Sequence, residues 1–160
     1  MTLRLIPMAT SLFAPYVSRL IQEYAVEKQR AGTWLPDQAL AYSENEFRRL
    51  LPQGQSTPNH YFFSFVDQSG QPIGVIWLHY SQADRSRQAF IYDFEIFEPF
   101  QGQGYGQEAL QAVFAYCQQS GLAKLSLHVF AHNTRARHIY QKLGFIETDI
   151  NMTKYLNGYV

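Results

Sequence analysis

The sequence is poor in cysteine and has no excess of charge of either sign. Cys117 is the single cysteine among 160 residues, so no disulfide can form within the chain, and this fits a reducing compartment. Thirteen lysines and arginines balance thirteen aspartates and glutamates, which gives no reason to expect a nucleic-acid partner. These absences favour a cytoplasmic protein that does not bind nucleic acid.

Long hydrophobic runs are also missing. No apolar stretch approaches the roughly 20 residues that span a bilayer, and the first residues lack the apolar core of a signal peptide. We therefore expect no membrane partner.

The histidines are not spaced as metal ligands. His128 and His132 flank the end of a predicted strand, and neither has a cysteine or carboxylate partner at the spacing of a zinc site. We therefore predict no metal ion.

Hydrophobic residues, by contrast, make up 46% of the chain and aromatic residues 16%, which indicates a folded globular protein. No linker, repeat or low-complexity tract divides the chain, so we expect a single domain over residues 1–160. Hydrophobic periodicity and Gly or Pro breakers predict, in chain order, strand 3–6, helices 10–32 and 36–51, strands 60–66, 72–80 and 90–97, helix 109–121, strand 125–130, helix 134–143 and one or more strands over 145–155.

Details of this pattern refine the expected elements. The three successive strands in the middle imply an antiparallel meander. Thr10 is the expected N-cap of the first helix and Asn133 that of the last. Pro15 can move the first helix start a few residues later, and Pro36 suits the first position of the second helix.

The segment 90–106 carries the main functional signal. Its first half is a predicted strand, its second half places glycine at 102, 104 and 106, and a helix follows. Such a junction leaves backbone N–H groups without partners at the positive end of the helix dipole, which suits phosphate oxygens. A glycine-rich turn alone is a weak signal, because a tight loop that binds nothing has the same pattern. The candidate anion-binding positions are Gln101, Gly102, Gln103, Gly104, Tyr105, Gly106 and Gln107.

A dinucleotide-binding Rossmann fold is the obvious rival for such a turn. That motif requires an acidic residue at the end of the next strand, about 20 residues onward, to hold a ribose. The next predicted strand is followed by Ala131, His132 and Asn133. The missing carboxylate disfavours a nicotinamide cofactor.

Two spaced motifs carry a resemblance to a known family. The first is Gln101-x-x-Gly104-x-Gly106 after Glu98-Pro99, and the second is Asn133-x-x-Ala136-x-x-x-Tyr140-x-Lys142-x-Gly144-Phe145. In order and separation they resemble motifs A and B of the GNAT superfamily of N-acetyltransferases. The order of the predicted elements also resembles that superfamily over nearly the whole chain.

The resemblance implies an α/β (α+β) fold, with a mixed central sheet of about six to seven strands flanked by about four helices. It implies acetyl-CoA as co-substrate, with its pyrophosphate on the glycine turn and its pantetheine arm along the backbone of Ile96 and Phe97. It also implies a coenzyme contact from Asn133, a proton from Tyr140 for the leaving thiolate, and a possible homodimer. Without it, Tyr140 is a core tyrosine and Asn133 a helix cap.

The residue that removes the amine proton is harder to assign. Asp93 and Glu95 share one face of the strand 90–97 by its two-residue period. Carboxylates inside an aromatic strand are costly to bury unless they are paired, hydrated or functional. Either can accept a proton, and equally their face can be open to solvent or each can pair with a nearby arginine. We rank Glu95 first and Asp93 second.

The sequence thus predicts an N-acetyltransferase that moves an acetyl group directly to a primary amine of a small molecule or protein. The alternative is a catalytically silent domain that binds acyl-CoA as a sensor or an interaction module. Trp34 lies in the link between the first two helices, where it is either a substrate-facing wall or a cover on the core.

Overall fold

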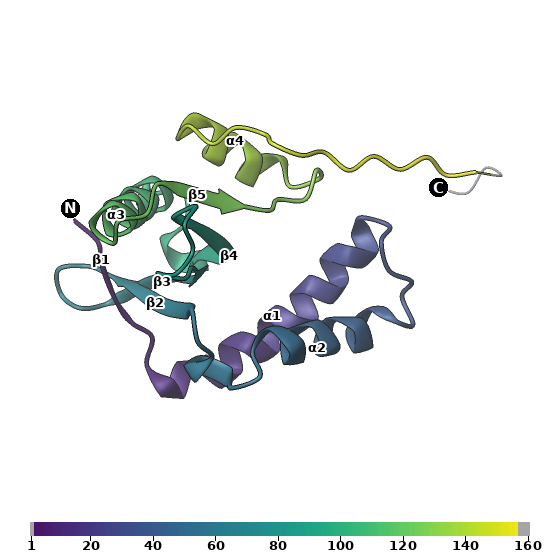
Figure 1. The fold of residues 1–160 in the computed structure, drawn as a ribbon, viewed down its shortest axis with the longest axis horizontal. Helices are drawn as coiled ribbons and strands as arrows, with labels where there is room; N and C mark the ends of the chain where they lie inside the picture. The colour runs from purple at the N-terminus through teal and green to yellow at the C-terminus, as the bar shows by residue number, and fades with distance from the viewer. Residues whose placement is uncertain (1, 157–160) are drawn as a thin grey trace.

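The sheet of this protein follows the chain order β1-β2-β3-β4-β5, and helices cover both of its faces (Figure 1). The computed structural model describes residues 2–156, so the expected domain over residues 1–160 extends past it at both ends. The elements are β1 (Arg4–Pro7), α1 (Thr10–Arg30), α2 (Ala39–Leu50), β2 (His60–Val66), β3 (Pro72–His79), β4 (Gln88–Ile96), α3 (Tyr105–Gln119), β5 (Lys124–Leu127) and α4 (Thr134–Lys142), with short 3₁₀ turns at Gly54–Ser56 and Glu98–Phe100.

Neighbouring strands from β1 to β4 are antiparallel. This confirms the predicted meander of β2, β3 and β4. β5 instead runs parallel to β4, because α3 lies between the two strands in the chain and returns it to the same end of the sheet. The result is the mixed α/β sheet that the sequence predicted.

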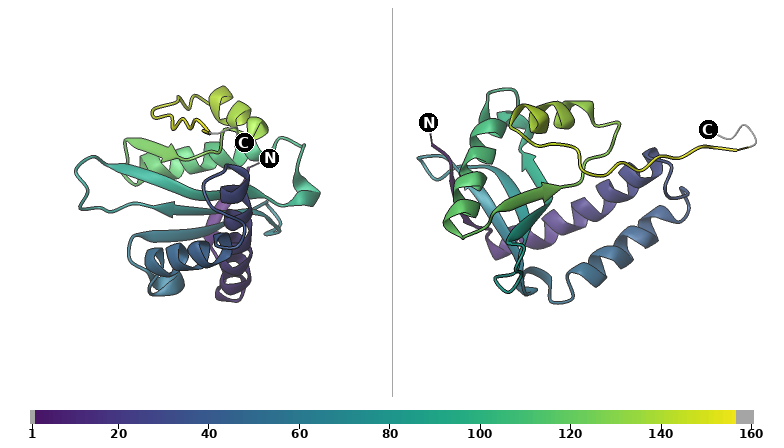
Figure 2. Two further views of the ribbon diagram at one scale, coloured as in Figure 1. Left: turned by 90° about the vertical axis from the view of Figure 1, so that its right-hand side faces the viewer. Right: turned by 45° about the horizontal axis from the view of Figure 1, so that its top comes forward.

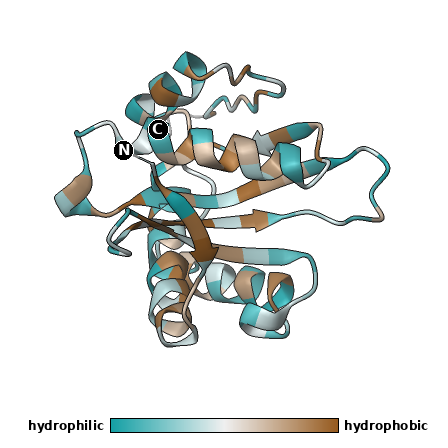
Figure 3. Ribbon diagram, turned by 90° about the vertical axis from the view of Figure 1, so that its left-hand side faces the viewer, coloured by the Kyte–Doolittle hydropathy of each residue, from teal (hydrophilic) through white to brown (hydrophobic). Residues whose placement is uncertain are grey.

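α1 and α2 lie on one face of the sheet, and α3 and α4 lie on the other (Figure 2). The core under α1 and α2 consists of Met8, Tyr16, Leu20, Phe47, Leu51, Phe62, Val75 and Trp77. The core on the opposite face includes Phe65, Ile76, Leu78, Ile91, Leu110 and Val113. Ile139 and Tyr140 of α4, and Leu143 just after it, pack at the edge of this core. Hydrophobic residues follow the strands between these two layers (Figure 3). Within residues 2–156, none of the helices combines the length and apolar character that a membrane crossing requires.

A β-bulge in β4 sets the direction of its polar side chains. Trp77 of β3 pairs with Asp93, but the next residue pairs with Ile91, so Tyr92 is an extra residue in β4. Ile91 and Phe94 both pack in the core beneath α3. The bulge therefore shifts the alternation by one residue and turns Asp93 toward α1.

The two central strands separate halfway along β4. Their pairing runs from Gln88 with Lys124 to Ile91 with Leu127, where β5 ends while β4 continues to Ile96. The backbone N–H of Phe97 donates to Ile73 of β3 at 2.9 Å. Because an antiparallel strand alternates the direction of its backbone groups, Ile96 and Phe94 direct theirs toward the opening beside β5.

The C-terminal segment departs from the expectation. The described sheet has five strands rather than six to seven, because residues 145–155 form no strand. The alternation of apolar residues over this segment is the signal of a strand, yet Ile146 is 82% and Met152 91% exposed. A strand needs a neighbouring strand for its backbone groups, and the described chain places none beside this segment.

Several expected boundaries were also wrong. α1 begins at Thr10 with Ala9 as its N-cap, and Pro15 lies inside the helix, where packing of the helix on the sheet outweighs one missing hydrogen bond. α2 begins at Ala39 rather than Pro36, because the backbone of residues 35–39 first closes a turn onto Leu35. β5 stops at Leu127, three residues early, where β4 turns away.

Gly74 lies where β3 closely approaches the end of β4. A Cβ on Gly74 would overlap the carbonyl oxygen of Glu95 and lie 3.1 Å from the Cα of Ile96. We expect Gly74→Ala to lower the free energy of unfolding by about 1–3 kcal/mol, as measured by urea denaturation. Gly106→Ala is the control, because its Cβ would meet nothing within 4 Å and a helical alanine is favoured over glycine. Equal stability of the two variants would contradict this account.

Candidate active site

A cavity of about 150 Å³ lies where β4 and β5 separate. Four consecutive residues of β4 form one side, the end of β5 and the residues after it form the other, and α4 closes it. The lining residues are Ile91, Tyr92, Asp93, Phe94, Leu127, His128, Val129, Phe130, Asn133 and Tyr140. The opening thus brings together Asp93, Asn133 and Tyr140, three of the predicted site residues, from distant parts of the chain.

Asp93 is the titratable carboxyl of this cavity. The hydroxyl of Tyr16 on α1 donates a hydrogen bond to its Oδ2 at 2.6 Å. The pKa of Asp93 is raised to about 7. Burial is the largest cause; the charge of Glu95 adds to it, while the Tyr16 hydrogen bond and the charge of Arg19 partly oppose it. Asp93 can therefore exchange a proton near neutral pH.

Glu95 is engaged elsewhere. Its Oε2 accepts a hydrogen bond from the guanidinium of Arg19 on α1 at 2.8 Å, and the same guanidinium also bridges Glu23 at 3.1 Å. Glu95 does not contribute to the cavity wall. Of the readings that the sequence left open for this residue, the structure shows the pairing with a nearby arginine.

Tyr140 reaches the cavity from α4. Burial, with a smaller contribution from the charge of Asp93, raises its pKa to about 12. Its ring lies edge-on to Phe145 at 5.5 Å, and Gly144, with φ 96°, makes the turn that brings Phe145 back against it. The hydroxyl of Tyr140 therefore stays protonated at neutral pH and can act as a hydrogen-bond donor.

The glycine turn lies at the start of α3. Gly102 and Gly104 have φ values of 73° and 87°, and Gly104 is the N-cap of the helix. A Cβ on Gly102, Gly104 or Gly106 would meet no protein atom within 4 Å, so the surface above the turn is open. No side chain caps the helix, and the N–H groups of Gly106 and Gln107 lie in the first turn, where an α-helix offers no carbonyl partner. This geometry fits a phosphate group.

Two glutamine side chains hold the turn from within. Gln101 Nε2 donates to the carbonyl of Ile96 at 2.8 Å, and Gln103 Nε2 donates to that of Pro99 at 3.0 Å. The Gln101 bond occupies the carbonyl of Ile96 but not its N–H, which faces the opening. The N–H of Phe97 donates instead to the carbonyl of Ile73. The backbone N–H groups of Phe94 and Ile96 therefore face the opening, where a bound chain could pair with them, whereas the N–H of Phe97 already has a partner.

Asn133 is a helix cap, as the sequence predicted. Its Oδ1 accepts a hydrogen bond from the backbone N–H of Ala136 at 3.3 Å, which satisfies one free donor at the start of α4. Because Asn133 also lines the cavity, the cap does not exclude a ligand contact.

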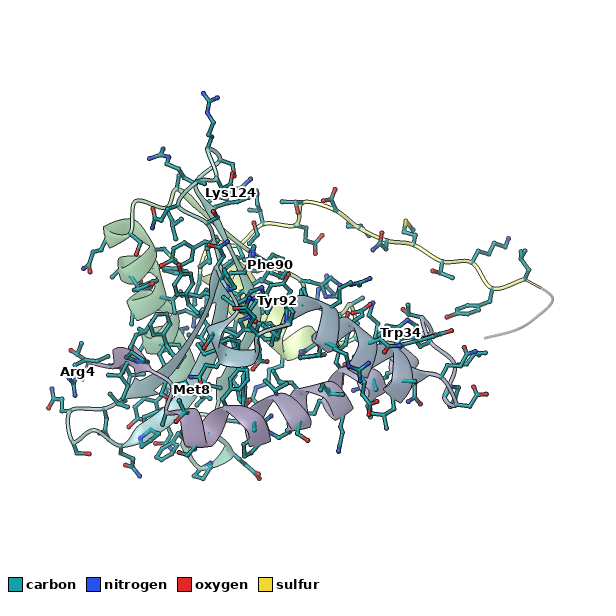
Figure 4. The ribbon with its side chains drawn as sticks, turned by 60° about the horizontal axis from the view of Figure 1, so that its bottom comes forward. Arg4, Met8, Trp34, Phe90, Tyr92 and Lys124 are labelled. Atoms are coloured by element: carbon teal, nitrogen blue, oxygen red, sulfur yellow. The ribbon has the colours of Figure 1, made fainter. Side chains whose placement is uncertain are left out.

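The α1 side of the cavity is aromatic. Phe130 lies 6.5 Å from Tyr24 of α1, and Tyr24 meets Trp34 edge-on at 5.6 Å. Figure 4 shows Trp34 in the link beyond α1, away from Phe90 and Tyr92 of β4. Trp34 lines a second cavity of about 210 Å³ against α2 and does not line the cavity at the β4–β5 opening.

The sequence reasoning missed Tyr16 and Arg19. Tyr16 packs in the core beneath α1, where a tyrosine on a helix usually has only a structural role. The available signal was its hydroxyl, because a buried tyrosine usually finds a hydrogen-bond partner. Tyr92 and Phe130 were also missed, since strand aromatics are normally structural.

Comparison with known proteins agrees with this geometry. The chain matches the family model described as Acetyltransferase (GNAT) family over residues 20–145. It is 44% identical over 156 residues to the uncharacterized N-acetyltransferase YycN of Bacillus subtilis (strain 168), with 98% of this chain and 100% of that protein covered. It is 35% identical over 149 residues to the uncharacterized N-acetyltransferase YdgE of the same organism, with 93% and 95% covered.

Solved structures share the fold. The crystal structure of YycN matches with a TM-score of 0.92 at 43% identity, covering 97% of this chain and 99% of that chain. The structure of AAC(6')-Iy, solved with a bisubstrate analogue that contains CoA, matches with a TM-score of 0.54 at 17% identity, covering 97% and 98%. At that identity the likeness is one of fold.

Fold and relatives together define an acetyltransferase. The chain belongs to the GNAT family, which confirms the family that the two sequence motifs predicted.

Proposed function

We propose that this chain transfers the acetyl group of acetyl-CoA to a primary amine of a small molecule or protein. The transfer is direct, without a covalent enzyme intermediate. The observation that carries the proposal is the single cavity at the β4–β5 opening, which joins Asp93 of β4 and Tyr140 of α4. A proton acceptor and a proton donor in one cavity are what acyl transfer between an amine and a thiolate requires.

The chain offers a consistent set of coenzyme contacts. The open turn from Gln101 to Gln107 would hold the pyrophosphate on its N–H groups. The backbone of Phe94 and Ile96 would pair with the pantetheine arm, and Asn133 would bind near the opening. Bound there, acetyl-CoA supplies the thioester. A structure of the same fold, that of AAC(6')-Iy, was solved with a CoA-containing analogue, which supports acetyl-CoA as the co-substrate.

Asp93 is the better candidate for the base, which reverses the order inferred from the sequence. Asp93 lines the cavity and its pKa of about 7 lets it both accept and release a proton. Glu95 instead forms an ion pair with Arg19 and does not line the cavity. Asp93 accepts the amine proton, and Tyr140 donates a proton to the departing thiolate.

Tyr140→Phe tests the acid. We expect turnover to fall about 100-fold or more, because the leaving thiolate loses its donor, while acetyl-CoA affinity changes little. Thiol release measures turnover, and calorimetric titration measures affinity. The matched control is Tyr61→Phe, a ring stacked on Tyr80 away from the cavity, which should leave both quantities unchanged. An unaltered rate in Tyr140→Phe would remove this tyrosine as the acid.

The function itself is tested by incubating the purified protein with acetyl-CoA and a panel of primary amines, including lysine-containing peptides. Amine-dependent thiol release, with one acetyl group gained by the amine in mass spectrometry, is the expected result. Acetyl-CoA binding without turnover on any amine of a broad panel would favour the silent acyl-CoA-binding domain instead.

A further inference from the structure

The hydroxyl group of Tyr16 is not explained by the packing of its ring. It lies on α1, is 6% exposed, and its ring meets Phe62 of β2 edge-on at 6.5 Å. A phenylalanine would satisfy these contacts equally well. The hydroxyl instead reaches β4 and donates to Oδ2 of Asp93 at 2.6 Å.

This bond fixes the orientation of the carboxyl. Asp93 follows the bulge of β4, and Tyr16 binds one of its two oxygens. The structure shows no second side-chain hydrogen bond to Asp93 within residues 2–156, so Oδ1 is the oxygen left for a ligand. The bulge of β4 turns Asp93 into the cavity, and the Tyr16 hydrogen bond orients its carboxyl there. Together they set the position at which Asp93 can accept a proton.

We propose that Tyr16 is a positioning residue of the acetyl transfer: its hydroxyl holds Oδ2 of Asp93 and so presents Oδ1 to the acceptor amine. The proposal rests on the proposed function, in which Asp93 is the base. Tyr16 itself does not line the cavity, and its own pKa, raised by burial and by the charge of Asp93, keeps it a donor throughout the working range.

The same bond also affects proton affinity. A donor to the ionised carboxylate favours the charged form, so it opposes the effect of burial on the pKa of Asp93. The other charged groups that act on Asp93 are Arg19 and Glu23 of α1 and Glu95 of β4. Three further titratable groups line the cavity, Tyr92 on β4, His128 after β5 and Tyr140 on α4, and Tyr16→Phe leaves all six in place.

The test is the pH profile of kcat/KM in Tyr16→Phe. A hydrogen bond to a charged group contributes about 1.5–3 kcal/mol, so its loss should move the limb at low pH upward by about one to two pH units. The control is Tyr80→Phe, which loses the hydrogen bond between the Tyr80 and Tyr116 hydroxyls in the opposite core. It should lower stability without moving the limb. A purely structural role for Tyr16 predicts the same unshifted profile in both variants, and that result would overturn the proposal.

A second readout does not depend on activity. The carboxyl of Asp93, isotope-labelled and assigned by comparison with Asp93→Asn, should titrate in NMR at higher pH in Tyr16→Phe than in the wild type. In the wild-type protein the ring carbon next to the Tyr16 hydroxyl should follow the same midpoint, so the bond is tested even if the variant folds poorly. An unshifted carboxyl, or a Tyr16 signal that ignores it, would sink the proposal. A shifted carboxyl in a protein that acetylates no amine would instead count against the proposed function alone.

Discussion

Asp93→Asn lowers turnover by about 100- to 10,000-fold, with little effect on acetyl-CoA affinity. The substitution keeps the size of the side chain and an oxygen for the Tyr16 hydroxyl, but it removes the carboxylate that we propose as the acceptor of the amine proton. Rates of thiol release with a productive amine measure the loss, and calorimetric titration with acetyl-CoA checks that binding is retained.

Glu95→Gln is the matched control for Asp93→Asn. It neutralises a carboxylate two residues away on the same face of β4, but one that pairs with Arg19 rather than lining the cavity. Loss of a partly exposed ion pair of this kind costs little stability, and Glu95 does not line the cavity. We therefore expect turnover to fall by less than about tenfold. A larger loss in Glu95→Gln than in Asp93→Asn would restore the order inferred from the sequence.

The pH dependence follows from the pKa of Asp93. A base acts only when it is unprotonated, so kcat/KM of the wild type should rise with pH through a midpoint near the pKa of about 7. The residual activity of Asp93→Asn should lack that limb. A wild-type profile that falls as pH rises through 7, or an Asn variant that keeps the limb, would assign the ionisation to another group.

Gly104→Glu should abolish acetyl-CoA binding. The new side chain would fill the open surface above the turn and place a negative charge beside the pyrophosphate, at the helix N-terminus that would otherwise attract it. We expect the Kd to rise more than about 100-fold, equivalent to about 3 kcal/mol. Calorimetric titration of both proteins gives the two affinities.

A matched control separates this effect from backbone strain. Gly70, in the turn between β2 and β3, has a φ of 86° against 87° for Gly104, and a Cβ there would also meet nothing within 4 Å. Gly70→Glu therefore adds the same charge and the same strain away from the active site, and should leave the Kd unchanged. Equal acetyl-CoA affinities in Gly104→Glu and the wild type would contradict the assignment of the phosphate site to this turn.

The parts of the site that the sequence predicted are those whose signal is local. The glycine turn, the start of α3 and the cap at Asn133 each follow from a few adjacent residues, because turn geometry and capping depend on neighbours in the chain. The family could be predicted because two such local motifs, the glycine turn and the segment from Asn133 to Phe145, occur in the order typical of that family.

The rest depended on contacts between distant segments. The proposed ranking of Asp93 above Glu95 rests on their contacts with Tyr16 and Arg19, which come from α1 and cannot be inferred from the sequence near β4. The bulge at Tyr92 is visible only in the pairing with β3. The strands expected over residues 145–155 failed for the same reason, because alternation predicts a strand but not whether a neighbour lies beside it.

The central claim is that acetyl-CoA binds across the glycine turn and the β4–β5 opening. Calorimetric titration of the wild-type protein with acetyl-CoA, with NAD as the control ligand, tests it most directly. Saturable binding of acetyl-CoA with no response to NAD is the predicted result. No binding of acetyl-CoA, or equal binding of NAD, would contradict the assignment of this site.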